Sequence, residues 1–142
     1  MRCETIMKDD VLYVLPTESA QRAAIIMRAE NVGFLPVCDE GGCVLGTLTD
    51  RDLAMRVCTV GVAASAVSVG AVMTRDLVAC RPEDDLTVAE RLMAEHGKSR
   101  ILITDGATRL LGIVSLSDVV KRDSNKHAAH TLRKIVEREY RY

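Results

Sequence analysis

The stretch Gly46-Thr47-Leu48-Thr49-Asp50-Arg51-Asp52 has a counterpart 66 residues later, Gly112-Ile113-Val114-Ser115-Leu116-Ser117-Asp118. In both copies the pattern predicts a short apolar strand that ends at a hydroxyl residue, and an aspartate in the first turn of the following helix. This order brings a hydroxyl group, a carboxylate and the free N–H groups of a helix start into one small volume. Such a place suits a sugar diol with a phosphate attached.

The repeat extends on both sides of this motif. Residues 5–56 align with residues 71–122 without a gap, and apolar positions repeat as well, as in Leu48 over Val114. The identical pairs are Met7/Met73, Asp10/Asp76, Pro16/Pro82, Ala23/Ala89, Met27/Met93, Asp39/Asp105, Leu45/Leu111, Gly46/Gly112, Asp52/Asp118 and Arg56/Arg122. A repeat of this length indicates two copies of one structural unit.

Each copy predicts the element order β-α-β-β-α. A short extended segment, Val11–Leu15 or Leu77–Cys80, runs into a proline, which disfavours helix just before it. The next helix is expected to be capped by Ser19 or Asp85 and to end near Asn31 or Gly97. Its buried face is expected to hold Ala20, Ala23, Ala24 and Met27 in the first copy, and Leu86, Ala89, Leu92 and Met93 in the second. The remaining elements are the strands Phe34–Cys38 and Val44–Leu48 with the helix Asp50–Val57, and the strands Arg100–Thr104 and Leu110–Val114 with the helix Leu116–Arg122.

The predicted fold class is therefore α/β (α+β), with two tandem units at residues 5–57 and 71–122. Residues 58–70 are small and weakly polar and form the predicted connection. A C-terminal helix is predicted over 127–140, with Leu132, Ile135 and Val136 as a short apolar stripe. We expect this helix to dock on its own core or on a partner chain.

Composition excludes several classes of function. With 48% apolar residues the chain has enough material for a real core, but one Phe, three Tyr and no Trp leave almost no stacking platforms for single-stranded nucleic acid. A formal net charge of −1 removes the broad basic field of most nucleic-acid-binding proteins, so nucleic acid is an unlikely partner. No membrane-spanning run and no signal peptide are visible, and we expect a cytoplasmic location without membrane contact.

Metal ligands and catalytic groups are poorly represented. The five cysteines contain no C-x-x-C pair and are expected to be buried hydrophobes, although Cys38 and Cys43 flank a turn and could face each other. His127 and His130 have a chelating spacing, but no third ligand accompanies them, so we predict no metal site. No Walker A loop, dinucleotide fingerprint, nucleophile elbow or supported acid–base pair is present, and we expect no catalysis.

With these elements in place, the sequence resembles a stand-alone, bacterial-type pair of CBS domains, the family named after cystathionine β-synthase. Both copies have the family's Gly-x-apolar-Ser/Thr-x-x-Asp motif. The openings Ile6-Met7 and Val72-Met73 and the strand Phe34-Leu35-Pro36-Val37 also match. The second copy departs at Leu102, where the family usually has proline. The resemblance covers residues 5–122 and implies two units packed as a pseudo-two-fold module.

The resemblance also implies an adenosine nucleotide (AMP, ADP or ATP) in the clefts between the repeats, as a regulatory ligand and not as a required cofactor. In the family the motif aspartate accepts hydrogen bonds from the ribose hydroxyls, and the Ser or Thr supports ribose or phosphate. The first site would then use Thr49 and Asp52, faced by Lys98, Ser99 and Arg100. The second would use Ser115 and Asp118, lined by Thr5, Ile6, Gly33 and Phe34.

A purely structural interpretation of the motif remains open. Thr49 with Asp52, and Ser115 with Asp118, have the spacing of a capping box, in which each side chain hydrogen-bonds the backbone of the other residue. Against this, capping boxes favour Glu or Gln over Asp, and the motif glycine would let a ligand approach the strand end closely. The alternative function is a protein-interaction module with unliganded clefts.

The charged residues suggest a difference between the two sites. Lys98 and Arg100 are the candidates for binding phosphate, with solvated surface charges as the open alternative. If they bind phosphate, the Asp52 site suits a polyphosphate better than the Asp118 site. Arg51, Arg56, Lys121 and Arg122 are expected to lie on solvated helix faces. Met27, Met55 and Met93 would offer adaptable apolar surface for the expected homodimer, and an unidentified protein partner would read out the ligand.

Overall fold

The computed structural model describes residues 1–122 and the helix 125–139, with side chains at 129–137 of that helix. It confirms the predicted mixed α/β fold. The second copy has the predicted order β-α-β-β-α, whereas the first has α-β-β-α, because segment 11–15 forms a single bridge and no strand. The first copy consists of α1 (Ala20–Glu30), β1 (Phe34–Cys38), β2 (Val44–Thr49) and α2 (Asp50–Arg56). The second consists of β3 (Ala79–Cys80), α4 (Leu86–His96), β4 (Arg100–Thr104), β5 (Leu110–Ser115) and α5 (Leu116–Val120).

The predicted ends of α1 and α4 are confirmed. Ser19 Oγ accepts a hydrogen bond from the Arg22 N–H at 3.0 Å, and Asp85 Oδ1 accepts one from the Thr87 N–H at 3.0 Å. Asn31 and Gly97 follow the helices in the left-handed conformation, with φ of 53° and 60°. The local sequence therefore specifies where these two helices start and stop.

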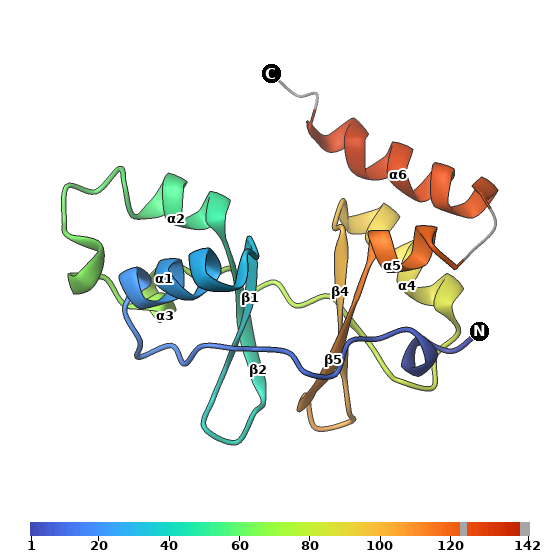
Figure 1. Cartoon of the computed structure of the whole chain (residues 1–142), viewed down its shortest axis with the longest axis horizontal. Coiled ribbons are helices and arrows are strands. Elements are labelled where there is room, and N and C mark those ends of the chain that lie inside the picture. The colour runs from blue at the N-terminus through green and yellow to red at the C-terminus, as the bar shows by residue number, and fades with distance from the viewer. Residues whose placement is uncertain (123–124, 140–142) are drawn as a thin grey trace. The chain divides into compact units, whose positions relative to one another are not determined.

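The chain divides into two compact units whose boundaries differ from those of the repeats. The central unit is Leu12–Leu77, and the composite unit combines Met1–Val11 with the chain from Val78 onward. The segment that leads into each repeat is thus exchanged: the first eleven residues pack with the second repeat, and the connecting segment packs with the first. Figure 1 shows the N-terminal segment, in blue, crossing beside β5.

In the central unit, β1 and β2 form an antiparallel pair, and the extended segment Val11–Leu15 adds only one parallel bridge, from Val14 to Val37. The core contains Val14, Ala20, Ala23, Met27, Leu35, Val37, Leu48, Val57, Val69, Val72 and Met73. The connecting segment contains structure of its own, η2 (Ala64–Ala66) and α3 (Val69–Val72), and Val69 is completely buried. Ala24, predicted to be buried, is exposed.

In the composite unit, β3 pairs in parallel with β4, and β4 pairs antiparallel with β5. The N-terminal segment begins with η1 (Cys3–Thr5) and then bridges β5 through Lys8 and Ile113. The core contains Cys3, Ile6, Cys80, Leu86, Ala89, Met93, Ile101, Ile103, Val114, Val119 and Ile135.

The C-terminal helix α6 (Asn125–Glu139) packs on α4 and α5 of its own unit (Figure 1). Of the predicted stripe, Ile135 is 8% exposed and joins the core, whereas Leu132 is 47% exposed. Thr131, which is 3% exposed, takes the place next to α4 instead. The prediction that the helix docks on its own core is confirmed, while Leu132 was wrongly placed in the buried stripe. Residue 140 of the predicted helix lies outside the described residues.

The prediction that three methionines offer an adaptable apolar surface is wrong for two of them. Met27 is 6% exposed and Met93 is fully buried, because both lie on the core faces of their helices. Only Met55 is exposed, at 58%. The methionines therefore give little support to the dimer expectation.

Cys38 pairs in register with Val44 and not with Cys43, and all five cysteines, which lie in the described part of the chain, are without disulfides. Within the described residues, none of the helices is long and apolar enough to cross a membrane.

Candidate functional site

The motif of the central unit forms a complete capping box at the start of α2. The Asp52 N–H donates to Thr49 Oγ1 at 3.1 Å, and the Thr49 N–H donates to Asp52 Oδ2 at 3.0 Å. The Asp52 side chain is 13% exposed. The capping box that the spacing allows is thereby confirmed, and it occupies one of the two carboxylate oxygens.

The motif of the composite unit has the same geometry at the start of α5. The Asp118 N–H donates to Ser115 Oγ at 3.2 Å, and the Ser115 N–H donates to Asp118 Oδ2 at 3.2 Å. Ser115 Oγ also donates to Asp118 Oδ2 at 2.5 Å, so this oxygen accepts two hydrogen bonds. The Asp118 side chain is 14% exposed. The cap therefore leaves Oδ1 of Asp118 for other partners, as it leaves Oδ1 of Asp52.

The motif glycines serve chain packing, which corrects the expectation that they admit a ligand. A Cβ atom at Gly46 would lie 2.6 Å from the Thr74 carbonyl oxygen and 2.9 Å from Met73 Sδ. At Gly112 the corresponding distances are 2.6 Å to the Lys8 carbonyl oxygen and 3.0 Å to Met7 Sδ. Only glycine permits this approach, because any side chain would overlap the backbone that crosses the strand.

The crossing segments were not foreseen as partners of the motif strands. Thr74 and Thr47 exchange backbone hydrogen bonds of 2.9 and 2.8 Å, and Lys8 and Ile113 exchange two of 2.9 Å. The one sequence signal that points to this arrangement is the identity Met7/Met73, since each methionine precedes the residue that bonds the motif strand. The crossing segment places Thr74 beside Asp52 and Lys8 beside Asp118.

Beside Asp52, the crossing segment and α2 supply a hydroxyl and a guanidinium. Thr74 Oγ1 donates to Asp52 Oδ1 at 3.4 Å. Arg56 Nη1 donates to the carbonyl oxygens of Val72 and Met73 at 3.0 and 3.2 Å and lies 3.9 Å from Asp52 Oδ1. Arg56 is exposed as predicted, at 48%, and it also fastens the crossing segment to α2.

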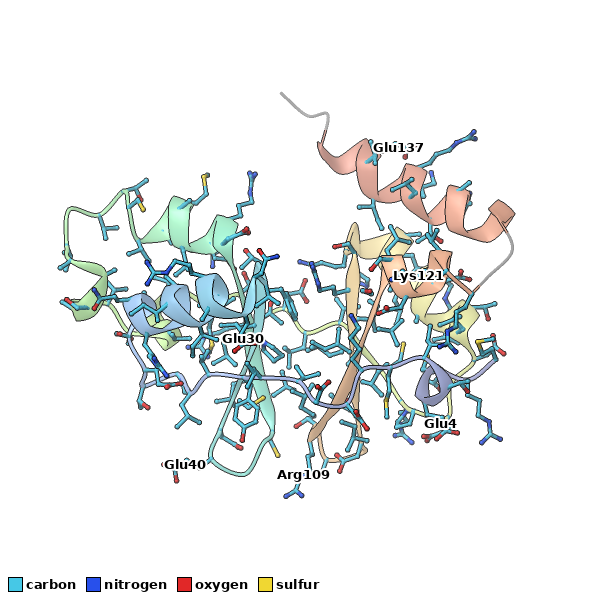
Figure 2. All side chains as sticks on the ribbon, viewed as in Figure 1. Glu4, Glu30, Glu40, Arg109, Lys121 and Glu137 are labelled. Atoms are coloured by element: carbon cyan, nitrogen blue, oxygen red, sulfur yellow. The ribbon has the colours of Figure 1, made fainter. Side chains whose placement is uncertain are left out.

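Beside Asp118, the same position holds an ammonium group. Lys8 Nζ lies 3.9 Å from Asp118 Oδ1, and the Lys8 side chain is 68% exposed. Arg51, Lys121 and Arg122 are exposed as predicted, and Figure 2 places Lys121 at the end of α5. Both motif aspartates thus belong to a capping box, but they have different neighbours.

The free N–H groups expected at the helix starts are largely used within each unit. The Asp50 N–H donates to the Gly33 carbonyl oxygen at 3.0 Å, and the Arg51 N–H donates to Asp50 Oδ1 at 2.8 Å. The Leu116 N–H donates to the Ser99 carbonyl oxygen at 2.8 Å. Loop carbonyls and caps thus satisfy the N–H groups of Asp50, Arg51, Asp52, Leu116 and Asp118, which leaves little of the backbone site for phosphate that was expected here.

The other predicted site residues fall into the two units as follows. Thr5 is exposed and Ile6 is buried in the core, and both belong to the composite unit with Ser115 and Asp118. Lys98, Ser99 and Arg100 belong to the same unit, whereas Gly33 and Phe34 belong to the central unit with Thr49 and Asp52. The assignment of Lys98, Ser99 and Arg100 to the Asp52 site, and of Gly33 and Phe34 to the Asp118 site, stays a prediction.

The N-terminal segment that places Lys8 is anchored through Cys3. The Cys3 N–H donates to the Asp84 carbonyl oxygen at 2.9 Å, and the side chain hydrogen-bonds Cys80. This bond lowers the pKa of Cys3, and it raises the pKa of Cys80, as burial also does. Both thiols lie in the core of the composite unit, so the segment is anchored at Cys3, five residues before Lys8 bridges β5.

The described residues contain no group of three or more His, Cys, Asp or Glu side chains that could hold a metal ion. His130 is exposed on α6, and the side chain of His127 lies outside the described residues.

Comparison with known proteins gives three informative matches. The chain is 38% identical to CBS domain-containing protein YhcV of Bacillus subtilis over 130 residues, covering 91% of each chain. The CBS domain pair of protein MJ0100, in complex with 5′-methylthioadenosine and S-adenosyl-L-methionine, matches at 21% identity, with a TM-score of 0.75, covering 85% of this chain and 94% of that chain. CBSX2 in complex with AMP matches at 24% identity, with a TM-score of 0.73, covering 84% and 93%.

The two structural matches show a shared fold, and the model of the CBS domain matches residues 3–58 and 69–125, one match for each repeat. The capping motif, the motif glycine and the crossing segment recur in both repeats. This chain belongs to the CBS domain family, as a pair of CBS domains.

Proposed function

We propose that this protein binds an adenosine-containing ligand through its motif aspartates and acts as a regulatory module. The observation that carries this proposal is the second carboxylate oxygen. In each motif Oδ2 is held by the capping box, while the partners of Oδ1 among the described residues are Thr74 and Arg56, or Lys8, at 3.4 to 3.9 Å. These contacts are longer than strong charge-assisted hydrogen bonds, so a ribose hydroxyl can compete for the oxygen.

The ligand class is supported by the two related domain pairs. One was crystallised with 5′-methylthioadenosine and S-adenosyl-L-methionine and the other with AMP. These molecules share adenine and a ribose diol but differ in the group at the 5′ position. The shared chemistry is the part that a carboxylate acceptor recognises, and we propose AMP, ADP or ATP as the ligand of this chain.

Calorimetric titration with AMP, ATP and S-adenosylmethionine tests the proposal. Asp52→Ala and Asp118→Ala are each expected to weaken binding at their own motif by about tenfold or more, because hydrogen bonds to a charged group contribute about 1.5–3 kcal/mol. Asp85→Ala is the matched control, since Asp85 also caps a helix but lies outside the motif. No heat with any ligand would favour the alternative of an unliganded interaction module.

Signalling would follow from a shift between conformations, because a ligand biases such an equilibrium only by its different affinity for the two states. Incubation with ATP should yield no product if the module is regulatory and not enzymatic. Product formation that scales with protein and is lost in Asp52→Ala would contradict this assignment.

We also propose a homodimer. The central unit exposes Met55, Val60 and Val62 at 58%, 54% and 52%. Sedimentation at micromolar concentration is expected to give twice the chain mass of 15.5 kDa. A single species of the chain mass would contradict the dimer without affecting the proposed ligand.

A further inference from the structure

Lys8 combines a hydrogen-bonded backbone with an exposed, charged side chain. Its N–H and carbonyl are held by Ile113 at 2.9 Å each, and its carbonyl oxygen sits against Gly112. The side chain, in contrast, is 68% exposed, and its ammonium lies 3.9 Å from Asp118 Oδ1. An ion pair of this exposure is weak, so the ammonium can leave the carboxylate at little cost while its backbone stays in place.

The Lys8 ammonium lies beside the carboxylate oxygen that the proposed ligand needs, Asp118 Oδ1. Asp118 Oδ2 is saturated by the Ser115 N–H and hydroxyl, which leaves Oδ1 for a ribose hydroxyl. A ligand that bonds Oδ1 therefore meets the Lys8 ammonium at the same atom. An unpaired carboxylate at this place would repel a phosphate, whereas a carboxylate with a neighbouring ammonium does not.

The central unit lacks this group. The residue aligned with Lys8 is Thr74, whose uncharged hydroxyl bonds Asp52 Oδ1 at 3.4 Å. The nearby Arg56 has its Nη1 committed to the carbonyl oxygens of Val72 and Met73. Asp118 therefore has an exposed ammonium group beside it, from Lys8. The equivalent position beside Asp52 has the hydroxyl group of Thr74.

We propose that Lys8 selects for an anionic 5′ group at the Asp118 motif: it neutralises Asp118 without ligand, and it turns to the phosphate when the ribose occupies Oδ1. This inference rests on the proposed adenosine binding. It reverses the expectation from the sequence that the Asp52 motif is the better one for phosphate. Phosphorylated adenosine should bind the Asp118 motif more tightly than adenosine or the sulfonium cation S-adenosylmethionine.

The test measures affinities for AMP, adenosine and S-adenosylmethionine in an Asp52→Ala background, so that only the Asp118 motif reports. Lys8→Met keeps the length of the side chain without its charge. It is expected to lower the ratio of AMP to adenosine affinity about threefold to tenfold, with adenosine affinity unchanged or higher. Lys8→Arg should retain the preference, and raising the salt concentration should reduce it.

The outcomes separate the two proposals. If none of the three molecules binds to the unaltered protein, the proposed function fails. If they bind to it but not in the Asp52→Ala background, the Asp118 motif is not a ligand site and the role of Lys8 is overturned. If AMP binds but Lys8→Met leaves the affinity ratio unchanged, the role of Lys8 is overturned and the proposed function stands.

A transfer experiment excludes a general loss of structure. Thr74→Lys in an Asp118→Ala background should raise the AMP preference of the Asp52 motif by a similar factor, because both positions bond their strand in the same way. An unchanged ratio in a protein that still binds adenosine would contradict the idea that this position sets the charge of the ligand.

Discussion

The two units share the same capping box and differ in the residues that surround it. Both cap a short helix with a hydroxyl and an aspartate, and both pass a crossing segment over a glycine. They differ beside the aspartate, where one has Thr74 with Arg56 and the other has Lys8. They differ again over the helices, because α6 covers α4 and α5 of the composite unit.

This difference indicates which positions are constrained by folding and which are open to specialisation. The cap and the glycine satisfy backbone geometry, so both copies keep them. The residue at position 8 or 74 contributes its backbone to the strand, and its side chain is not needed for that pairing. Its chemistry can therefore change from one unit to the other without loss of the backbone pairing.

The helix α6 gives the largest expected effect on stability. Ile135→Ala should lower the free energy of unfolding by about 2–4 kcal/mol, because it removes a side chain that joins the core of the composite unit. Leu132→Ala is the matched control on the same helix, where 47% exposure predicts a loss below about 1 kcal/mol. Equal losses in urea denaturation would contradict the docking of α6 through Ile135.

The motif glycines come next. Gly46→Ala and Gly112→Ala should each destabilise the protein by about 1–3 kcal/mol, since the added methyl group would overlap a backbone oxygen at 2.6 Å. Gly106→Ala serves as control, because a Cβ atom there meets nothing within 4 Å. Thermal and chemical denaturation of the three variants give the comparison. If only one of the two motif glycines tolerated alanine without loss of stability, the two crossing segments would not be packed equally closely.

The caps should have smaller and matching effects. Thr49→Ala and Ser115→Ala are each expected to cost about 1 kcal/mol, the usual loss when a capping hydroxyl is removed. Ser68→Ala is a suitable control, because Ser68 precedes α3 without a capping hydrogen bond from its side chain. A clearly larger loss at Ser115 would show that its additional bond to Asp118 strengthens the composite cap.

The smallest expected effect is on the pH dependence of stability. It arises at Cys38, a core residue of the central unit. Burial raises the pKa of Cys38 from its usual 9.0 to about 11, and the aligned residue of the other unit is Thr104, which does not titrate in this range. The unfolded chain loses the thiol proton first, so stability is intact below about pH 9 and falls between pH 9 and 11.

At pH 9.5 the Cys38 contribution to this loss is about 0.8 kcal/mol. Denaturation curves at pH 7.5 and 9.5 should therefore differ less in Cys38→Val than in the parent protein. Cys58→Ala, at an exposed site, should behave like the parent. An unaltered pH dependence in Cys38→Val would show that another group is responsible.

Much of the local structure could be predicted from sequence. Ser19, Asp85, Asn31 and Gly97 each have a side chain or backbone preference that fixes a helix end, and the structure agrees with all four. The hairpin strands followed from apolar runs separated by turn residues; Figure 2 shows Glu40 and Arg109 at the two hairpin tips. The spacing of hydroxyl and aspartate identified both the cap and the candidate site.

Other features depend on residues far apart in the chain. The pairing of Lys8 with Ile113 leaves no periodic signal, because a single bridge involves one residue from each side. The hydrogen bonds of Arg56 could not be predicted, because its partners, the carbonyl oxygens of Val72 and Met73, lie 16 and 17 residues further along the chain. Ala24 and Leu132 were wrongly predicted to be buried. Helical periodicity shows which residues share a face, but it does not show which of them another element packs against.

The sequence alone determined the two repeats, the ends of their main helices and the motif that closes each one, because capping and turn preferences act within a few residues. Only the tertiary structure decided that each crossing segment packs against a motif glycine, and that a lysine stands at one aspartate where a threonine stands at the other. Those contacts arise when distant segments meet, and their free energy comes from close packing and charge proximity, which no local pattern encodes.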